Sequence, residues 1–304
     1  MNKALDGWTS GFVGMLMFSG SLPATRMAVL GFDPVFVTLA RASIAGLLGV
    51  AMLWILGAPR PTRDDWASLA IVAMGGVVGF PLLTALALRQ ITSAQSMIFV
   101  GLLPVLTAGF GVLRAGERPR LLFWVFSGLG ASLVVGFSLH RSVGTSIAGS
   151  LLMLAAVALA GLGYAEGAKL SRRLGGWQVI SWALVVALPL MLPLTFVRLP
   201  STLQHVPIGS WVGLGYVSVF SMLIGFVFWY RGLALGGIAA VSQLQLLQPF
   251  CGLMLSAGLL HETVRPALVV VMVAAACCAY GAKQFATWAV APAEPVKLRI
   301  EAPG

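Results

Sequence analysis

Charged side chains are scarce in this sequence. Only 9% of its 304 residues are Asp, Glu, Lys or Arg, whereas 59% are hydrophobic. A soluble domain carries about 25% charged residues, so the composition excludes an ordinary soluble fold. Cysteine is also rare: the chain has only Cys251, Cys277 and Cys278, and all three fall within apolar runs. The sequence therefore predicts neither a disulfide framework nor a cysteine metal site.

The sequence also lacks the motifs of an enzyme. Its three histidines lie in connections or at the ends of apolar runs, and no Ser–His pair, HExxH motif or Cys/His cluster is present. No glycine-rich phosphate loop occurs, so ATP is not expected to drive the protein directly. We therefore predict no catalytic residues, no metal site and no cofactor.

Long apolar runs dominate what is present. Ten runs approach or exceed the length of about 20 residues that a spanning helix needs. Because a backbone exposed to lipid must satisfy its own hydrogen bonds, such continuous runs predict helices. The predicted fold class is an all-α integral membrane protein with ten transmembrane helices. The runs cover approximately residues 8–30, 35–57, 67–88, 93–114, 121–139, 148–169, 177–197, 210–232, 238–259 and 267–288.

The formal net charge of +10 comes from Lys and Arg residues whose placement indicates how the chain is oriented in the membrane. If both termini are cytoplasmic, the inside segments carry thirteen Lys and Arg residues and the outside segments carry five. This bias obeys the positive-inside rule and predicts cytoplasmic N and C termini. Trp229 and Tyr230, near the predicted inner end of the eighth run, are typical of the aromatic belt at a membrane interface. No nucleic-acid partner is expected.

The second half of the chain repeats the first at an offset of 145 residues. The aligned pairs are Pro104 with Pro249, Glu117 with Glu262 and, with one residue of slippage, Gly79-Phe80 with Gly225-Phe226. Five spans is an odd number, so the second copy enters the membrane inverted. Inverted repeats are typical of secondary transporters, which bind solute near the midplane where the copies meet. We assign residues 1–145 and 146–288 to the two five-helix repeats, and 289–304 to a disordered tail.

The doubled motif resembles the drug/metabolite transporter superfamily, and within it the ten-helix, EamA-like exporters. The similarity extends over residues 8–288 and is greatest to bacterial amino-acid exporters, including the aromatic amino-acid branch. It implies a multi-pass carrier of the bacterial inner membrane that exports small metabolites, amino acids among them, by alternating access. His261 departs from the family's glycine. The motif residues are Ser93-Ala94, Pro104 and Gly116-Glu117-Arg118 in the first half, and Ala239-Ala240, Pro249 and His261-Glu262 in the second.

Polar side chains within the runs supply candidate substrate-binding residues. In the ninth run, Ser242, Gln245 and Pro249 follow one helical stripe, and Gln248 flanks it. A glutamine amide both donates and accepts, so it suits the ammonium or the carboxylate of a zwitterion. The stripe either lines a solute pathway or packs helices together. The candidates are Ser21, Tyr164, Ser242, Gln245 and Gln248.

Two charges and two prolines within the runs complete the candidate site. Arg41 either holds a substrate carboxylate, reaches the outer surface or ties two helices together. Glu166 either pairs with Lys169 at the inner surface or carries a proton. Pro104 and Pro249 lie at matched depth and are either paired hinges or fixed kinks.

Two other functions remain open from sequence. One is export of organic cations or drugs, against which the runs offer almost no acidic residue. The other is a membrane-embedded enzyme, for which no nucleophile or acid–base pair is found. The expected partners are a small-molecule substrate and the lipid bilayer, and two complete halves in one chain make a monomer sufficient.

Overall fold

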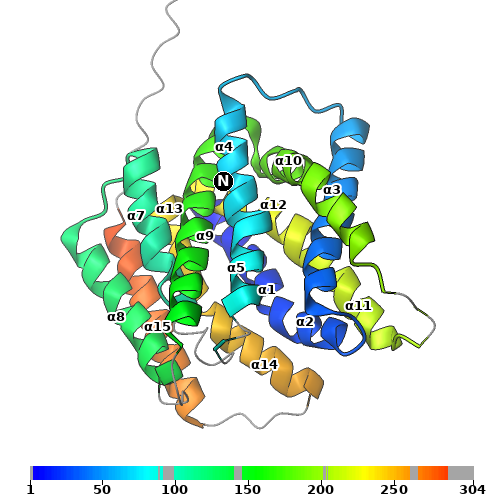
Figure 1. The fold of residues 1–304 in the computed structure, drawn as a ribbon. Helices are drawn as coiled ribbons and strands as arrows, with labels where there is room; N and C mark the ends of the chain where they lie inside the picture. Colours follow the sequence, from blue (N-terminus) through cyan, green and yellow to red (C-terminus); the bar gives the residue numbers. More distant parts are fainter. Residues whose placement is uncertain are drawn as a thin grey trace, which may run out of the picture.

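The computed structural model describes residues 3–87, 90–91, 99–139, 146–200, 203, 205–260 and 266–286, and all regular structure in these ranges is helical (Figure 1). The first half contains α1 (Lys3–Ser19), α2 (Ser21–Val29), α3 (Pro34–Ile55), α4 (Asp65–Val72), η1 (Ala73–Gly79), α5 (Phe80–Ala87), α7 (Leu103–Ala115) and α8 (Leu121–Leu139). The second half contains α9 (Ile147–Leu174), α10 (Gly176–Val197), α11 (Ile208–Tyr216), η2 (Val217–Ile224), α12 (Gly225–Gly236), α13 (Ile238–Ser242), η3 (Gln243–Leu246), α14 (Gln248–Leu260) and α15 (Pro266–Phe285).

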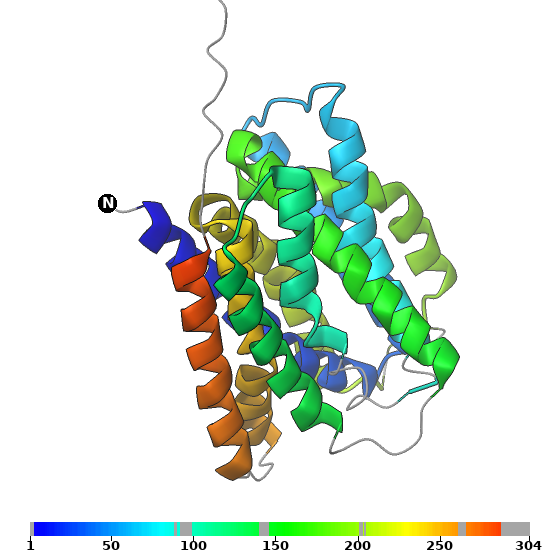
Figure 2. The same cartoon turned by 90° about the vertical axis from the view of Figure 1, so that its left-hand side faces the viewer.

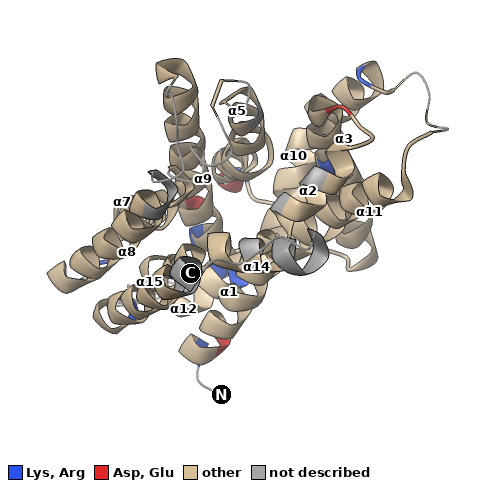
Figure 3. Cartoon of the chain, turned by 90° about the horizontal axis from the view of Figure 1, so that it is seen from below, with Lys and Arg blue, Asp and Glu red and all other residues tan. Residues whose placement is uncertain are grey.

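These elements account for the ten predicted membrane segments. Among the described residues, six helical stretches are long and apolar enough to cross a bilayer, and α7 and most of α8 form two shorter apolar helices. The α13–η3–α14 segment and α15 occupy the ninth and tenth predicted runs. The prediction of an all-α membrane fold built from two five-helix repeats is confirmed. Charged residues are correspondingly sparse along the ribbon (Figure 3).

The two halves pack together with an approximate twofold relation. α1 packs on α12 of the second half, and its counterpart α9 packs on η1 and α5 of the first half. Two further close pairs, α3 with α10 and α8 with α15, each join equivalent helices of the two repeats (Figures 1 and 2). Because exchanging the halves maps these pairs onto one another, the bundle has the arrangement expected of an internal repeat.

The repeat extends to a local irregularity of the backbone. η1 and η2 are both π-helical and occupy equivalent positions in the third and eighth segments. Each ends at the Gly-Phe pair that aligns the two halves in sequence, Gly79-Phe80 and Gly225-Phe226. π-helical turns are rare and occur frequently at functional sites. Both lie toward the middle of their segments, the depth at which a carrier binds solute.

The ninth segment is not the continuous α-helix on which the predicted polar stripe was drawn. α13 ends at Ser242, four residues follow as the 3₁₀ turn η3, and α14 begins at Gln248. Pro249 therefore lies in the first turn of α14, and Pro104 lies in the first turn of α7. A proline at a helix start loses no intrahelical hydrogen bond. The role of these two prolines as hinges stays a prediction. Both lie at the start of a helix, in equivalent segments of the two halves.

Candidate solute-binding site

Arg41, Tyr164 and Gln245 converge between the two halves of the bundle. Arg41 lies on α3 of the first half, whereas Tyr164 lies on α9 and Gln245 on η3 of the second. The Tyr164 hydroxyl faces the Gln245 side chain and lies within electrostatic reach of the Arg41 guanidinium. We call these three residues the polar cluster. It unites two predicted substrate-binding residues with the predicted intramembrane cation.

Tyr164 and Gln245 are buried and Arg41 is half-buried, yet the hydrogen bonds of the polar cluster are incomplete. Both amide atoms of Gln245 and Nε of Arg41 are buried without a hydrogen-bond partner, so the facing Tyr164 hydroxyl does not reach hydrogen-bonding geometry with the amide. Tyr230 Oη and Gln243 Oε1 are likewise buried and unpaired. An unpaired buried donor or acceptor costs about 1–3 kcal/mol, and most such groups in stable folds are paired. A bound solute or ordered water would offset this cost.

Aromatic rings from both halves pack beside the polar cluster. The Phe226 ring centroid lies 5.0 Å from that of Phe18 and 5.9 Å from that of Tyr164, and both pairs meet edge to face. Trp229 lies 5.8 Å from Tyr164 in the same geometry. We call Phe18, Phe226 and Trp229 the aromatic wall. Its two phenylalanines are buried, with 5–6% of their surface exposed, so the aromatic wall packs against Tyr164 inside the bundle.

The assignment of Trp229 and Tyr230 to the interface belt is wrong. Both side chains are completely buried, because α12 packs against α1, α9 and α10. Glycines on α1 permit this close approach: a Cβ at Gly14 would lie 2.9 Å from the backbone nitrogen of Trp229. The two aromatics are therefore part of the core that supports the site.

The other predicted substrate-binding residues lie apart from the polar cluster or are already bonded. The Ser21 hydroxyl donates to Ser221 Oγ on η2 at 2.7 Å, which links the two halves. Ser242 donates to the Ala239 carbonyl at 2.9 Å and is fully buried, which matches the helix-packing alternative. Gln248 is half-buried at the start of α14. Their roles in substrate binding stay predictions.

Glu166 is fully buried and paired with residues of the first half. It accepts from Arg114 Nε of α7 at 2.7 Å and from Ser68 Oγ of α4 at 2.6 Å. The predicted pair with Lys169 is present at 3.5 Å. Buried carboxylates persist only when paired and hydrogen-bonded, so this arrangement supports a structural role over proton transport.

Two further buried carboxylates meet the same end of α9. Glu117 accepts from Arg172 Nη2 at 2.8 Å and from the backbone N–H groups of Ile238 and Ala239 at 2.8 Å each. Its negative charge thus caps the amino end of α13, which the helix dipole favours. Asp65 of α4 pairs with Arg173. We call Asp65, Glu117 and Glu166, with Arg114, Arg172 and Arg173, the α9 charge cluster.

Every ion pair of the α9 charge cluster joins the first half to the second. The sequence identified Glu117 as a repeated motif residue and Glu166 as a partner of Lys169, but it did not identify Arg114, Arg172 or the amino end of α13 as partners. A pair such as Glu117 with Arg172 is separated by 55 residues, and spacing along a helix gives no signal for it. The cluster therefore joins the two halves at this end of α9.

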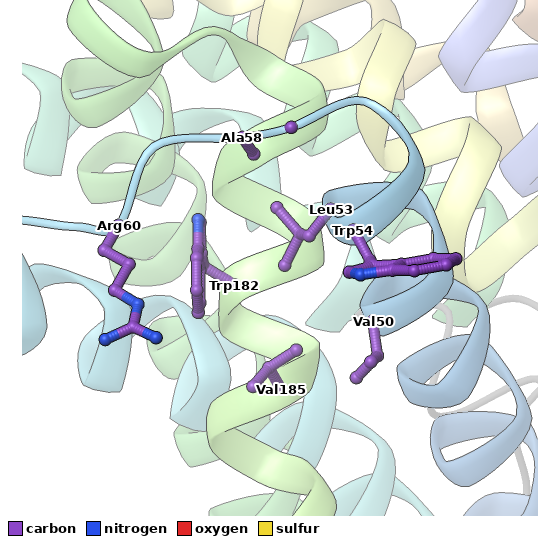
Figure 4. Close-up of a pocket in the computed structure, with 8 residues that line it drawn as sticks. Val50, Leu53, Trp54, Ala58, Arg60, Trp182 and Val185 are labelled. Carbon is purple, nitrogen blue, oxygen red and sulfur yellow. The ribbon is translucent and has the colours of Figure 1, made fainter.

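A groove of about 320 Å³ between α3 and α10 is separate from the polar cluster (Figure 4). Its wall residue Trp54 is 83% exposed, so the groove opens on the perimeter of the bundle. None of the predicted substrate-binding residues lines it. The lining residues are Val50, Leu53, Trp54, Gly57, Ala58, Arg60, Trp182 and Val185. Within the described residues, no three potential metal ligands come together.

A ten-segment bundle of two inverted halves, with unpaired polar groups buried between them, is the construction of a membrane transporter. The pattern of the EamA-like transporter family matches residues 7–139 and again residues 147–282. The chain therefore belongs to the EamA-like transporter family, and it is a transporter and not an enzyme. The predicted boundary between the repeats, after residue 145, and the predicted disordered tail, 289–304, lie at or within stretches outside the described ranges. Both assignments therefore stay predictions.

Individual relatives are also named as transporters or exporters, but only some of the names give a substrate. The uncharacterized transporter YdeK of Bacillus subtilis (strain 168) is 59% identical over 286 residues, which cover 94% of this chain and 100% of that protein. A probable terminal-alkyne amino-acid exporter of Streptantibioticus cattleyicolor is 22% identical over 242 residues, covering 77% of this chain and 79% of its own. A crystal structure with 20% identity covers 92% of this chain and 97% of its own at a TM-score of 0.77, which shows the fold alone.

Proposed function

We propose that this transporter exports small metabolites, amino acids including aromatic ones, across the bacterial inner membrane by alternating access. The observation that carries the proposal is the polar cluster with its unpaired buried groups beside the aromatic wall. Binding sites for small molecules combine an apolar lining with a few convergent polar groups. An amino acid with an apolar side chain matches both parts.

The amide of Gln245 supplies the chemistry that a zwitterionic head group requires. Its Nε2 can donate to a carboxylate and its Oε1 can accept from an ammonium group, and both atoms are buried and unpaired. The adjacent aromatic wall favours the apolar side chain by excluding water from it. The name of the Streptantibioticus relative, an amino-acid exporter, supports the same substrate class.

Alternating access requires one end of the bundle to close while the other opens. The α9 charge cluster supports this mechanism, since its ion pairs hold the two halves together at one end. Export then consists of breaking these pairs to admit solute from the cytoplasm, and reforming them behind it. The direction of transport and the cytoplasmic location of this end belong to the proposal.

Transport by the purified protein in liposomes tests the proposed function. We expect labelled phenylalanine, leucine or a related amino acid to exchange faster than in protein-free liposomes. Gln245→Ala should reduce this exchange roughly tenfold while leaving the folded fraction unchanged, because it removes about one or two hydrogen bonds to solute. Gln178→Ala, in the first turn of α10, is the matched control for loss of a glutamine side chain and should leave the exchange rate unchanged. Failure of every amino acid to exceed the protein-free rate would refute the proposal.

A further inference from the structure

Arg41 is a cation inside a membrane segment without a counter-ion among the described residues. α3 begins at Pro34, so Arg41 lies about 10 Å along the helix axis from its start. Its Nε is buried and unpaired, and no described acidic residue forms an ion pair with it. A charge in this position is costly and usually serves function.

Each described acidic residue is either bonded to groups other than Arg41 or lies outside the site. Glu166, Glu117 and Asp65 belong to the α9 charge cluster. Asp33 caps α3, accepting from the backbone of Val35 and Phe36, and the remaining two are Asp6, in the first turn of α1, and Asp64, in the α3–α4 connection. The polar cluster therefore carries the charge of Arg41 without a described carboxylate to balance it.

The three members of the polar cluster differ in charge and in whether they can accept a hydrogen bond. Arg41 offers only donors and a permanent positive charge, whereas Gln245 and Tyr164 both donate and accept. A guanidinium binds a carboxylate through two parallel charge-assisted hydrogen bonds, which are about twice as strong as neutral ones. Arg41 lies on α3 of the first half, and Tyr164 and Gln245 lie on α9 and η3 of the second, so a carboxylate held by Arg41 would lie on the side of the site that faces their polar groups.

We propose that Arg41 binds the carboxylate of the transported solute, and that the site selects acids and zwitterions against organic cations. The inference rests on the proposed function and specifies which solutes it accepts. Gln245 and Tyr164 then complete the head-group site, and the aromatic wall receives the apolar side chain. An organic cation would meet the unbalanced charge of the half-buried Arg41, where repulsion is screened less than at an exposed surface.

A pair of solutes that differ only at the carboxyl group tests this assignment in the wild-type protein. Phenylalanine and phenylalaninamide share the ring and the amino group, but the amide has no carboxylate. Apparent affinity, measured as inhibition of amino-acid exchange in liposomes and as thermal stabilisation in detergent, should be roughly 10- to 100-fold weaker for the amide. Equal affinities would overturn the inference while leaving the transport function standing.

Variants at Arg41 assign the discrimination to this residue. In Arg41→Gln, phenylalanine should lose its advantage over phenylalaninamide, because the charge that distinguishes them is gone. Arg41→Lys should retain part of it, since lysine keeps the charge but not the paired geometry. Arg63→Gln, at an exposed position of the α3–α4 connection, is the control for loss of one positive charge and should behave as wild type.

The outcomes separate the two proposals. Undiminished preference for phenylalanine in a folded Arg41→Gln protein would overturn the role of Arg41. If Arg41→Gln does not fold, the comparison of phenylalanine with its amide in the wild type decides the question. If the wild type transports neither these solutes nor any other amino acid, the proposed function itself fails.

Discussion

At the residue scale, Glu166 illustrates what a sequence can and cannot predict. The spacing of three residues on a helix predicts its contact with Lys169, because i and i+3 lie on one face. Its stronger partner Arg114 is 52 residues away in the chain and depends on how α7 packs against α9. Tyr164 and Gln245 are identifiable as polar residues in apolar runs, but their proximity to Arg41 is a property of the packed bundle.

Replacing Glu166 by Gln should weaken closure of the bundle at the α9 charge cluster. Gln retains a hydrogen bond to Ser68 but loses the ionic pair with Arg114. The Arg114 side chain is 41% exposed, so water can solvate the freed guanidinium, and the loss of stability should be limited to about 1–2 kcal/mol. Thermal unfolding in detergent measures the loss, and maleimide labelling of a cysteine introduced at the buried Ser171 of α9, in a protein lacking its native cysteines, should become faster.

Lys169→Gln is the matched control, because its amine lies 3.5 Å from Glu166 and is 48% exposed. It should change stability by less than about 0.5 kcal/mol. A double-mutant cycle of Glu166→Gln with Arg114→Gln should show a clear coupling energy. Purely additive effects would mean that this pair does not hold the two halves together.

At the element scale, the positions of the helices are predictable but their interruptions are not. Hydropathy reports which stretches of the chain are apolar enough to cross the membrane, and this information sets the ten runs. The π-helical turns η1 and η2 and the 3₁₀ turn η3 change only the register of backbone hydrogen bonds, which leaves apolar composition unaltered. The continuous helical stripe predicted for the ninth run fails at η3 for this reason, although its member Gln245 lies in the polar cluster.

The α1–α12 contact depends on the absence of side chains between the two helices. A Cβ added at Gly232 would lie 2.5 Å from the backbone nitrogen of Gly11, so Gly232→Ala must push the helices apart. We expect a loss of about 1–3 kcal/mol in unfolding free energy, measured by denaturation in mixed micelles. Gly109→Ala is the matched control, since no atom lies within 4 Å of its added Cβ. A wild-type stability for Gly232→Ala would contradict the close packing.

At the scale of the whole molecule, the two halves meet at two different kinds of contact. Near the middle, the polar cluster leaves buried groups unpaired, whereas at one end the α9 charge cluster pairs its buried carboxylates. The proposed mechanism uses this contrast: the solute would supply the missing partners at the site, and the ion pairs between the halves would open and close the path. From the sequence we predicted two copies of five spans and their inversion, but not which end of the bundle carries the ion pairs between the halves.

The central claim is that the second half is an inverted copy of the first, and equivalent connections test it most directly. Arg60 and His205 are separated by the repeat offset of 145 residues, and both are exposed. The connection carrying Arg60 crosses the top of Figure 1, whereas α11, which follows His205, begins at the lower right. Single cysteines at these positions, in a protein lacking its native cysteines, should react with membrane-impermeant maleimide from the cytoplasmic side at 60 and only from the outside at 205. Labelling of both from the same side would contradict the account.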